Sequence, residues 1–485
     1  MATTTRADRA AAETGAGSGQ VFGHETTQEQ QATATLKIAE LSDEWVAGGY
    51  VDTVLLAVPD LQGRLKGKRY DAEHFCRRVA QHSSGMCSYV LATDVAMSAA
   101  DGFALTSWEQ GYQDLSVKPD LTAIRIVPWE ARTALVMGDA TAPDGRRVEV
   151  APREILRRQL VRLAQHGLYP MVGIETEFSL YRGTYTALEE GGFRDLRPVA
   201  AGNLDYALDY DPVSDRFFRH LHRALKGAGL PVEAIKTEAG PGQSEITFRY
   251  GAALAACDQH LMLKHAARAL GARAGLAPTF MAAPETGHAN GMHLHLSLWS
   301  RNTSALSGFD GALTETGRHA IGGLLTALPH LAPLYAPNTN SYKRFTPGSF
   351  APTAFTWGFD NRTCAVRVVG GRRLGLRRLE VRVPGADANP YLALAAALAA
   401  ITHGIEHQLD PGPPQNGNAY RATDGCRPLP PTLTDALADF QDSPLAHEAF
   451  GPAVVGHLTR LAELELDHQE RQVTDVERRR WLTTA

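Results

Sequence analysis

In the first part of the chain, the spacing of apolar residues predicts one helix followed by several short strands. Apolar residues recur at helical spacing over 34–47, and the apolar run after them stops at Pro59 and Asp60, which indicates a strand that ends in a turn. A further turn of Pro, Asp and Gly at 143–145 precedes a change of pattern. The strands predicted here lie at 51–58, 123–127 and 133–137, and the residues 61–69 are predicted to form a turn and a further strand.

From Pro152 onwards, longer helical periods alternate with strands, and an irregular segment reaches to about residue 210. We predict helices at 152–166, 214–228, 252–273, 315–334, 389–407, 432–440, 446–449 and 452–480, and strands at 170–180, 244–250, 293–299 and 378–383. The prediction is an α+β chain without internal repeats. It comprises a disordered tail over 1–35, a small β-rich domain over 36–147 and a large mixed domain over 148–485.

Composition narrows the class of protein. A net charge of −5 over 485 residues gives no basic excess of the kind that nucleic-acid binding requires, so we expect no nucleic-acid partner. The five cysteines have no paired spacing, which favours a reduced, cytoplasmic protein. Residues 1–35 lack the pattern of a signal peptide, and the longest apolar stretch, 391–401, is too short to span a bilayer. We therefore expect no membrane partner.

Carboxylates and histidines recur at every second position of the predicted strands, as in Glu175 with Glu177 and His293 with His295. Alternate side chains of a strand face the same way, so each pair projects to one side. Hard divalent cations such as Mg²⁺ prefer carboxylate oxygens and neutralise phosphates during transfer. Six candidate ligands suit two or more such ions: Glu175, Glu177, Glu238, Glu245, His293 and Glu380.

An arginine-rich segment follows the acidic strands. Guanidinium groups match the geometry of phosphates and carboxylates, so small anions are the expected partners. Acidic strands followed by basic loops indicate an enzyme in which a nucleotide reacts at bound metal ions. For Arg372, Arg373 and Arg377 a salt-bridged surface is an equally good interpretation. The arginines of the segment are Arg344, Arg362, Arg367, Arg372, Arg373, Arg377, Arg378 and Arg382.

The order and context of these motifs resemble the glutamine synthetase family, from about residue 36 to the C-terminus. The motifs that carry the resemblance are Glu-x-Glu-Phe at 175–178, Gly-Gln-x-Glu at 242–245, Gly-Met-His-x-His-x-Ser at 291–297, Asn-Ser-Tyr-Lys-Arg-x-x-Pro-Gly at 340–348, Asn-Arg-Thr at 361–363, Glu-x-Arg at 380–382 and Asn-Pro-Tyr at 389–391.

The resemblance implies a β-grasp-like N-terminal domain and a catalytic domain whose antiparallel sheet lines a bifunnel, with ATP entering one end and glutamate the other. It implies two or three Mg²⁺ or Mn²⁺ ions per active site. It also implies a ring-shaped homo-oligomer, a dodecamer of two hexameric rings, with each active site between neighbouring subunits. The partners are then small molecules: ATP, glutamate and an amine.

The resemblance also implies a role for each motif residue. The first metal would be held by Glu177, Glu238 and Glu245, and the second by Glu175, His293 and Glu380. Glutamate would contact Arg344, Arg382 and the loop at Gly291, and the transferring phosphate would face Arg362 and Arg367. ATP would be seated by Tyr250, His295, Ser297 and Arg378. ATP would convert the glutamate γ-carboxylate into an acyl phosphate, which an amine then attacks.

The chain departs from ammonia-using members of the family at Phe350, where they carry a glutamate that helps to hold and deprotonate ammonium. An aromatic side chain offers apolar surface to an organic substituent instead. The segment 343–353 matches γ-glutamylpolyamine and γ-glutamylethanolamide synthetases. We therefore predict a ligase that joins glutamate to a polyamine, ethanolamine or another organic amine. Glutamine synthetase proper, a non-catalytic structural relative and a guanidine phosphotransferase are the alternatives.

The sequence does not fix the roles of three further sites. His288 and Ala289 replace part of the usual glutamate-binding loop, so glutamate could be held differently. Asp94 is the candidate acid that would accept the amine proton across a subunit boundary. Tyr420 falls near the position where some members are adenylylated, but its flanks differ, which favours a structural tyrosine. The identity of the amine and the choice of metal are not fixed by these patterns.

Overall fold

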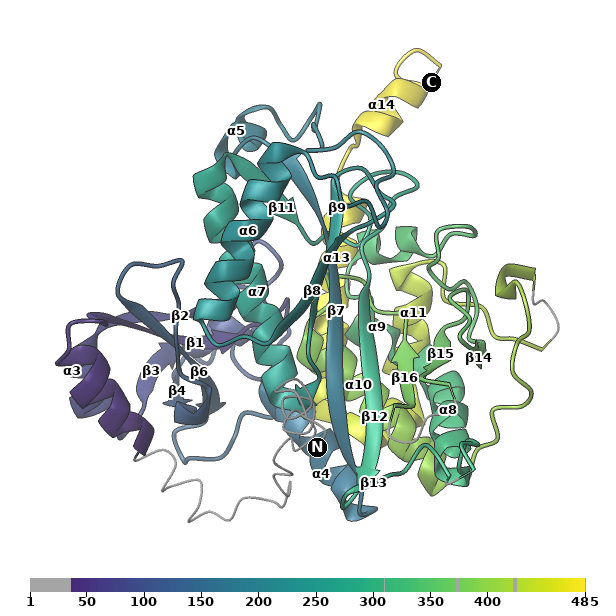
Figure 1. Ribbon diagram of the computed structural model, residues 1–485, viewed down its shortest axis with the longest axis horizontal. Helices are drawn as coiled ribbons and strands as arrows, with labels where there is room; N and C mark the ends of the chain where they lie inside the picture. The colour runs from purple at the N-terminus through teal and green to yellow at the C-terminus, as the bar shows by residue number, and fades with distance from the viewer. Residues whose placement is uncertain (1–35, 309, 372–375, 422–424, 485) are drawn as a thin grey trace, which may run out of the picture.

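Two β-sheets follow each other along the chain in the computed structural model, which describes residues 36–308, 310–371, 376–421 and 425–484 (Figure 1). Among these residues the first sheet has six strands in the order β2-β1-β6-β4-β3, with β5 paired to β6. The first strand pairs parallel to β6 and antiparallel to β2. The bounds are β1 Thr53–Pro59, β2 Leu65–Asp71, β3 Ser84–Cys87, β4 Asp114–Pro119, β5 Arg125–Ile126 and β6 Thr133–Thr141.

The second sheet has ten strands among the described residues, with the central order β14-β15-β16-β12-β7-β9-β8. Its long strands β7 and β12 are antiparallel and form the middle of the sheet. The bounds are β7 Tyr169–Arg182, β8 Val232–Thr237, β9 Gln243–Phe248, β10 Gly251–Ala252, β11 Leu276–Thr279, β12 Met292–Ser300, β13 Thr303–Ser304, β14 Trp357–Phe359, β15 Val366–Val369 and β16 Arg378–Val381.

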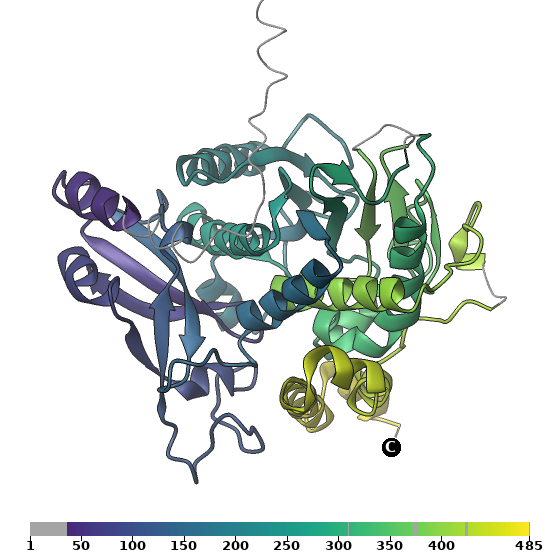
Figure 2. The same ribbon diagram turned by 90° about the horizontal axis from the view of Figure 1, so that it is seen from below.

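Helices surround the second sheet. Near the junction with the first sheet, α4 packs against the Ala-rich, buried α10, as Figure 2 shows. Helix α8 approaches α10 so closely that a β-carbon at Gly323 would lie 2.1 Å from the Ala400 carbonyl oxygen. The bounds are α3 Ala72–His74, α4 Pro152–Gln165, α5 Tyr185–Glu190, α6 Pro212–Gly227, α7 Ala253–Ala274, α8 Glu315–Ala327, α9 Ala332–Tyr335, α10 Pro390–Glu406, α11 Leu433–Gln441, α12 Pro444–Phe450, α13 Pro452–Glu470 and α14 Asp475–Trp481.

Two predicted helices are broken. The helix expected over 315–334 changes to a 3₁₀ turn at Leu328–Leu331, where Pro329 cannot donate a backbone hydrogen bond. The helix expected over 452–480 ends at Glu470, and α14 starts afresh because Thr474 and Glu477 form a capping box. The short strands β3, β4, β8, β10, β11, β13, β14 and β15 were not predicted, and α5 lies in the segment expected to be irregular. The domain boundary near 148 stays a prediction.

A buried arginine joins the two sheets. Arg153, at the start of α4, is 2% exposed. Its Nε donates to Asp139 Oδ1 on β6 at 3.0 Å, and its Nη1 donates to Asp258 Oδ1 on α7 at 2.6 Å. Its Nη2 pairs with Asp120, directly after β4. One guanidinium therefore balances three carboxylates from both parts of the chain.

Arg153→Ala should lower the free energy of unfolding by about 3–5 kcal/mol, because it leaves the buried Asp258 without its ion-pair partner, whereas Asp139 keeps Arg157. Urea unfolding followed by circular dichroism measures the loss. The matched control is Arg146→Ala, which breaks an exposed pair with Asp144 and should cost less than about 1 kcal/mol. Equal losses in the two variants would contradict the bridging role.

Candidate active site

The strand register of the second sheet brings the predicted site residues together. On β7, Glu177 lies opposite Glu245 of β9, and Glu175 lies opposite His293 of β12. On the other side of β12, His295 lies opposite Glu380 of β16. Neighbouring residues in register lie within reach of each other's side chains. Carboxylates far apart in the sequence therefore meet on one region of the sheet.

The first acidic group consists of Glu177, Glu238 and Glu245, whose oxygens lie within 4.8 Å of one another. Glu238 directly follows β8, in the connection to β9. Burial raises the pKa of Glu245 to about 9, and the charges of Glu175, Glu238 and Glu177 add to the rise. Burial and the charge of Glu177 raise the pKa of Glu238 to about 7. These carboxylates repel each other when ionised, and a bound cation would relieve the repulsion.

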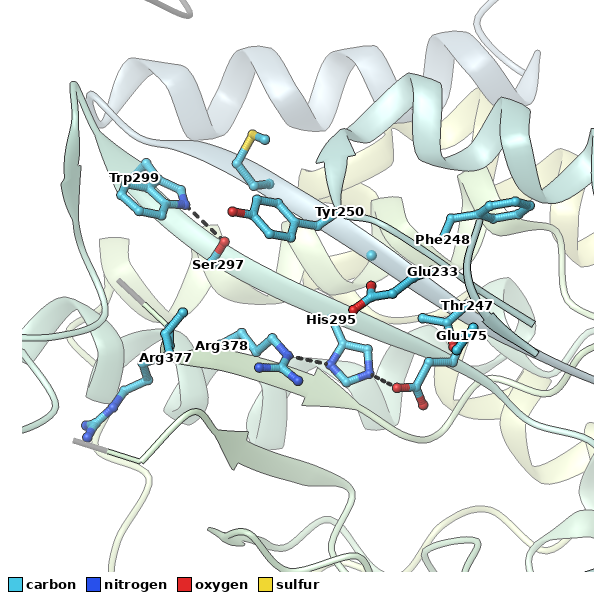
Figure 3. A pocket seen from close by; sticks show the side chains of 14 residues that line it. Glu175, Glu233, Thr247, Phe248, Tyr250, His295, Ser297, Trp299, Arg377 and Arg378 are labelled. Carbon is cyan, nitrogen blue, oxygen red and sulfur yellow. Dashed lines mark hydrogen bonds and ion pairs between the residues drawn. The ribbon is translucent and has the colours of Figure 1, made fainter. Parts of the chain in front are cut away.

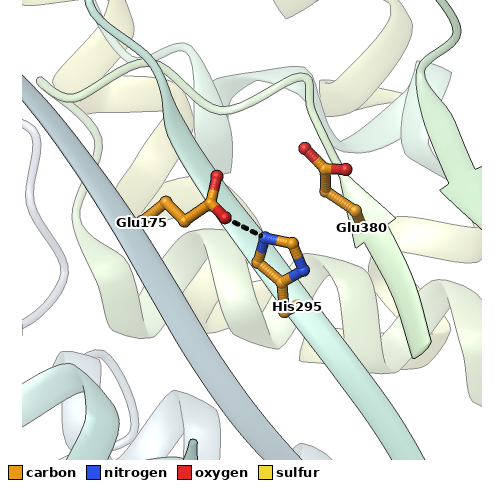
Figure 4. A group of neighbouring side chains, drawn as sticks. All are labelled: Glu175, His295 and Glu380. Atoms are coloured by element: carbon orange, nitrogen blue, oxygen red, sulfur yellow. Dashed lines mark ion pairs between the residues drawn. The ribbon is translucent and has the colours of Figure 1, made fainter. Parts of the chain in front are cut away.

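The second group brings Glu380 and Glu175 to His295 (Figure 4). His295 Nε2 lies 2.8 Å from Glu175 Oε1, while His293 Nδ1 lies 3.3 Å from Glu175 Oε2 and 3.6 Å from Glu380 Oε1. Both histidines thus reach the same carboxylates, although the sequence assigned only His293 to the metal. Burial opposes ionisation of Glu380, but the charges of Arg382 and the two histidines lower its pKa to about 2.

A cavity of about 380 Å³ adjoins this group and is lined by all four residues predicted to seat ATP (Figure 3). Arg378 Nε donates to His295 Nδ1 at 3.0 Å, which directs His295 Nε2 towards Glu175. Gly173 is part of the wall, where a β-carbon would lie 3.7 Å from both Tyr250 and His295. The four predicted residues are Tyr250, His295, Ser297 and Arg378, and the lining that the sequence did not indicate includes Met171, Glu233, Phe248 and Trp299.

The two arginines expected at glutamate are buried beside the acidic groups. Arg344 donates to the carbonyls of Val383 and Arg382 at 3.0 and 3.1 Å, and burial lowers its pKa to about 10. Arg382 pairs with Glu380, and its buried Nε donates no hydrogen bond among the described residues. A β-carbon at Gly291 would lie 2.7 Å from His293 Nε2 and 2.9 Å from Arg344 Nη2. A side chain at this position would clash, so glycine lets the backbone approach His293 and Arg344 closely.

The remaining arginines differ in their surroundings. Arg367 donates to Glu380 Oε2 at 2.8 Å and also pairs with Asp360, whereas Arg362 is exposed in the loop between β14 and β15. Arg377 donates to the backbone carbonyls of Gly371 and Gly311, which fits a structural role. Arg372 and Arg373 lie outside the described residues.

Phe350 and Asp94 occupy different places. Phe350 has a left-handed backbone (φ +59°) and is 59% exposed, while its carbonyl accepts a hydrogen bond from Arg382 Nη2 at 3.2 Å. It therefore lies next to the buried arginines. Asp94 accepts a hydrogen bond from the Ser98 amide and lines a separate cavity of about 340 Å³ against α13. Within this chain Asp94 does not line the cavity of Tyr250 and His295, and its role across a subunit boundary stays a prediction.

Lys236 of β8 is a site residue that the sequence patterns did not indicate. Its Nζ pairs with Glu238, lies 3.2 Å from Asp205 Oδ1 and stacks 4.3 Å above the ring of Tyr206. The register also places Lys236 opposite Glu245. The alternation of Lys236 with Glu238 could have indicated this pairing, but Asp205 and Tyr206 belong to a loop whose position no period reveals.

The donor set fits hard divalent cations. The group with histidine contributes Glu175 and His295 to a cavity that arginine and aromatic side chains also line, and the all-carboxylate group lies further along the same strand, β7. Burial and the neighbouring carboxylates raise the pKa values of Glu238 and Glu245, and a bound cation would favour their ionised forms. Such an arrangement is typical of an enzyme that transfers phosphate from a nucleotide.

Comparisons with known proteins identify the family. The glutamine synthetase catalytic domain matches residues 149–481. The chain is 45% identical over 436 residues to a γ-glutamylethanolamide synthetase of Streptomyces coelicolor, covering 90% of this chain and 93% of that one. It is 32% identical to a glutamate–isopropylamine ligase of a Pseudomonas species, covering 89% and 95%. The solved structure of GmaS without ligand matches with a TM-score of 0.78 at 26% identity, covering 92% and 100%.

The chain belongs to the glutamine synthetase family. The resemblance to its amine-ligase branch and the α+β fold class are both confirmed. No helix among the described residues is long and apolar enough to cross a bilayer. The roles of individual site residues stay predictions.

Glu245→Gln should raise the melting temperature of the metal-free protein at pH 8, because burial raises the pKa of this carboxyl group to about 9 and folding then requires it to take up a proton, which glutamine does not need. The same substitution should reduce the further rise that Mg²⁺ or Mn²⁺ produces, because a ligand is lost. Thermal unfolding in EDTA and in excess metal measures both effects. Glu189→Gln, on the exposed surface of α5, is the control and should change neither. A variant that is less stable without metal would contradict the account.

Proposed function

We propose that this protein is an ATP-dependent ligase that joins the γ-carboxylate of glutamate to an organic amine, giving a γ-glutamyl amide, ADP and phosphate. The observation that carries the proposal is Phe350 beside Arg344 and Arg382, in a site that keeps the acidic groups of the family. The similarity to a γ-glutamylethanolamide synthetase and a glutamate–isopropylamine ligase supports it. Polyamines, ethanolamine and small alkylamines are the acceptor classes.

Binding would orient glutamate before chemistry. The buried Nε of Arg382 and the buried guanidinium of Arg344 would donate to its carboxylates, and the backbone of the loop at Gly291 would contact the amino acid. Burial strengthens these contacts, because water does not compete for the donors. The cavity at Tyr250, Ser297 and Arg378 would hold ATP, with its phosphates directed towards the acidic groups.

In the first step a γ-carboxylate oxygen attacks the γ-phosphorus of ATP, and the bond to the bridging oxygen breaks to release ADP. Mg²⁺ or Mn²⁺, two or three per site and held by Glu177, Glu238, Glu245, Glu175, Glu380 and His293 or His295, would neutralise the developing phosphate charge. Arg367 and the exposed Arg362 would contribute positive charge at the transferring group.

In the second step the neutral amine attacks the acyl carbon, the carbon–oxygen bond to phosphate breaks, and a proton leaves the nitrogen. Phe350 would place apolar surface against the substituent of the amine, where ammonia-using relatives carry a carboxylate. Asp94 of a neighbouring subunit would accept the proton. This role requires the proposed ring assembly of two hexamers, and the proposed location is the cytoplasm.

The experiment that tests the function is phosphate release from ATP with glutamate and Mg²⁺, comparing ammonium with putrescine, spermidine, ethanolamine and isopropylamine. We expect one class of organic amine to be preferred, with the γ-glutamyl amide confirmed by mass spectrometry. Turnover with ammonium alone would establish the alternative, glutamine synthetase. Absence of both turnover and Mg-ATP binding would indicate a non-catalytic relative.

Phe350→Glu should move the preference from the organic amine towards ammonium by about tenfold in relative kcat/KM, because it restores a carboxylate for a small cation and removes apolar surface. Competition between the two nucleophiles in one reaction measures the ratio. Phe350→Leu keeps an apolar side chain and should retain the preference for the organic amine. Identical ratios in the Glu variant and the unaltered protein would show that residue 350 does not set acceptor choice.

A further inference from the structure

The segment 415–421 is fastened to the loop that carries Arg362. Asn361 Nδ2 donates to the Gly417 carbonyl at 2.7 Å and to the Gln415 carbonyl at 3.2 Å. Thr363 Oγ1 accepts from the Ala419 amide at 2.9 Å. Arg362 lies between these two anchoring residues in the chain. The segment therefore follows the loop expected to face the transferring phosphate.

The same segment reaches the loop of Phe350 through Tyr420. The Tyr420 hydroxyl donates to the Ala351 carbonyl at 3.1 Å. Burial raises the pKa of Tyr420, while the backbone of Phe350 and the charges of Arg382 and Arg344 oppose the rise. The hydroxyl thus lies beside the arginines expected to bind glutamate, in contact with the residue that follows Phe350.

The Phe350 loop needs such contacts to keep its shape. A non-glycine residue at φ +59° is in a sparsely populated conformation, and it persists only where the surroundings hold it. Arg382 holds the Phe350 carbonyl, and Tyr420 holds the next carbonyl along the chain. Ser349 adds a turn within the loop, since its hydroxyl donates to the Thr346 carbonyl at 2.7 Å. Among these contacts, only that of Tyr420 comes from the segment attached to the Arg362 loop.

We propose that Tyr420 is a positioning residue that holds Phe350 in place for the organic amine and links the amine-binding loop to the Arg362 loop. This inference rests on the proposed function. It assigns Tyr420 a part in acceptor recognition through Phe350, without direct contact with the reacting atoms. Loss of the hydroxyl would let the loop relax from its left-handed conformation. The amine would then bind less well, while ATP and glutamate, which have other contacts, would not.

The test is Tyr420→Phe, which removes the hydroxyl and keeps the ring. We expect the KM for the preferred organic amine to rise about fivefold, as the loss of one hydrogen bond of ordinary strength predicts, with kcat and the KM values for ATP and glutamate within twofold. Hydrogen exchange of the backbone amides at 346–353 should become faster. Tyr185→Phe is the matched control: its hydroxyl donates to the Pro278 carbonyl away from the site, and neither readout should change.

The two readouts separate this inference from the proposed function. If the unaltered protein makes no amide from any amine, the proposed function fails, and hydrogen exchange at 346–353 still decides whether Tyr420 holds the loop. Unchanged exchange in Tyr420→Phe would overturn the positioning role. Faster exchange with an unchanged KM for a turned-over amine would overturn its part in acceptor recognition. A loss of kcat for every acceptor, without a change in KM, would also contradict it.

Discussion

The register between the antiparallel strands of the second sheet is the constraint on which the site depends. It sets Glu175 against His293, Glu177 against Glu245 and Glu380 against His295. A shift of one residue would send each of these side chains to the other face of the sheet. Apolar residues next to them in the strands, such as Ile174 and Leu294, are buried on the opposite face and therefore fix the register through the core. The same strand register thus buries the apolar side chains in the core and brings the site residues together.

This register concentrates negative charge on one region of the sheet. The two acidic groups differ in how far neighbouring basic side chains neutralise that charge. Glu380 pairs with Arg367 and Arg382, and Glu175 contacts two histidines, so the second group is largely balanced by the protein itself. In the first group Lys236 pairs with Glu238 and His293 Nε2 lies 3.9 Å from Glu177 Oε1, but the pKa values of Glu238 and Glu245 stay raised. A divalent cation therefore gains most at the first group, where binding relieves repulsion as well as forming bonds.

Much of the fold and the site could be predicted from the sequence, because both leave local patterns. The alternation in β7 and β12 predicted two strands with paired ligands, and Pro152 and Pro390 begin helices that were predicted within two residues. Strands such as β14 and β15 were not predicted, because three or four residues are too few to show an alternating pattern. His293 and His295 cannot be separated by a pattern, since they share one face and differ only in what lies beside them. The backbone of Phe350, the backbone contacts of Arg377 and the pairing of Lys236 depend on tertiary contacts, which no local period records.

The most direct test of the proposed acyl-phosphate intermediate is the transfer of an isotopically labelled oxygen atom from glutamate to phosphate. Glutamate labelled with ¹⁸O in its γ-carboxylate is converted with ATP and the preferred amine, and the released phosphate is analysed by mass spectrometry. Attack of the carboxylate on ATP followed by displacement at the acyl carbon predicts that each phosphate carries one carboxylate oxygen, in equal amount to the amide formed. Phosphate without label, or label transfer without amide, would contradict a ligase that activates glutamate as its acyl phosphate.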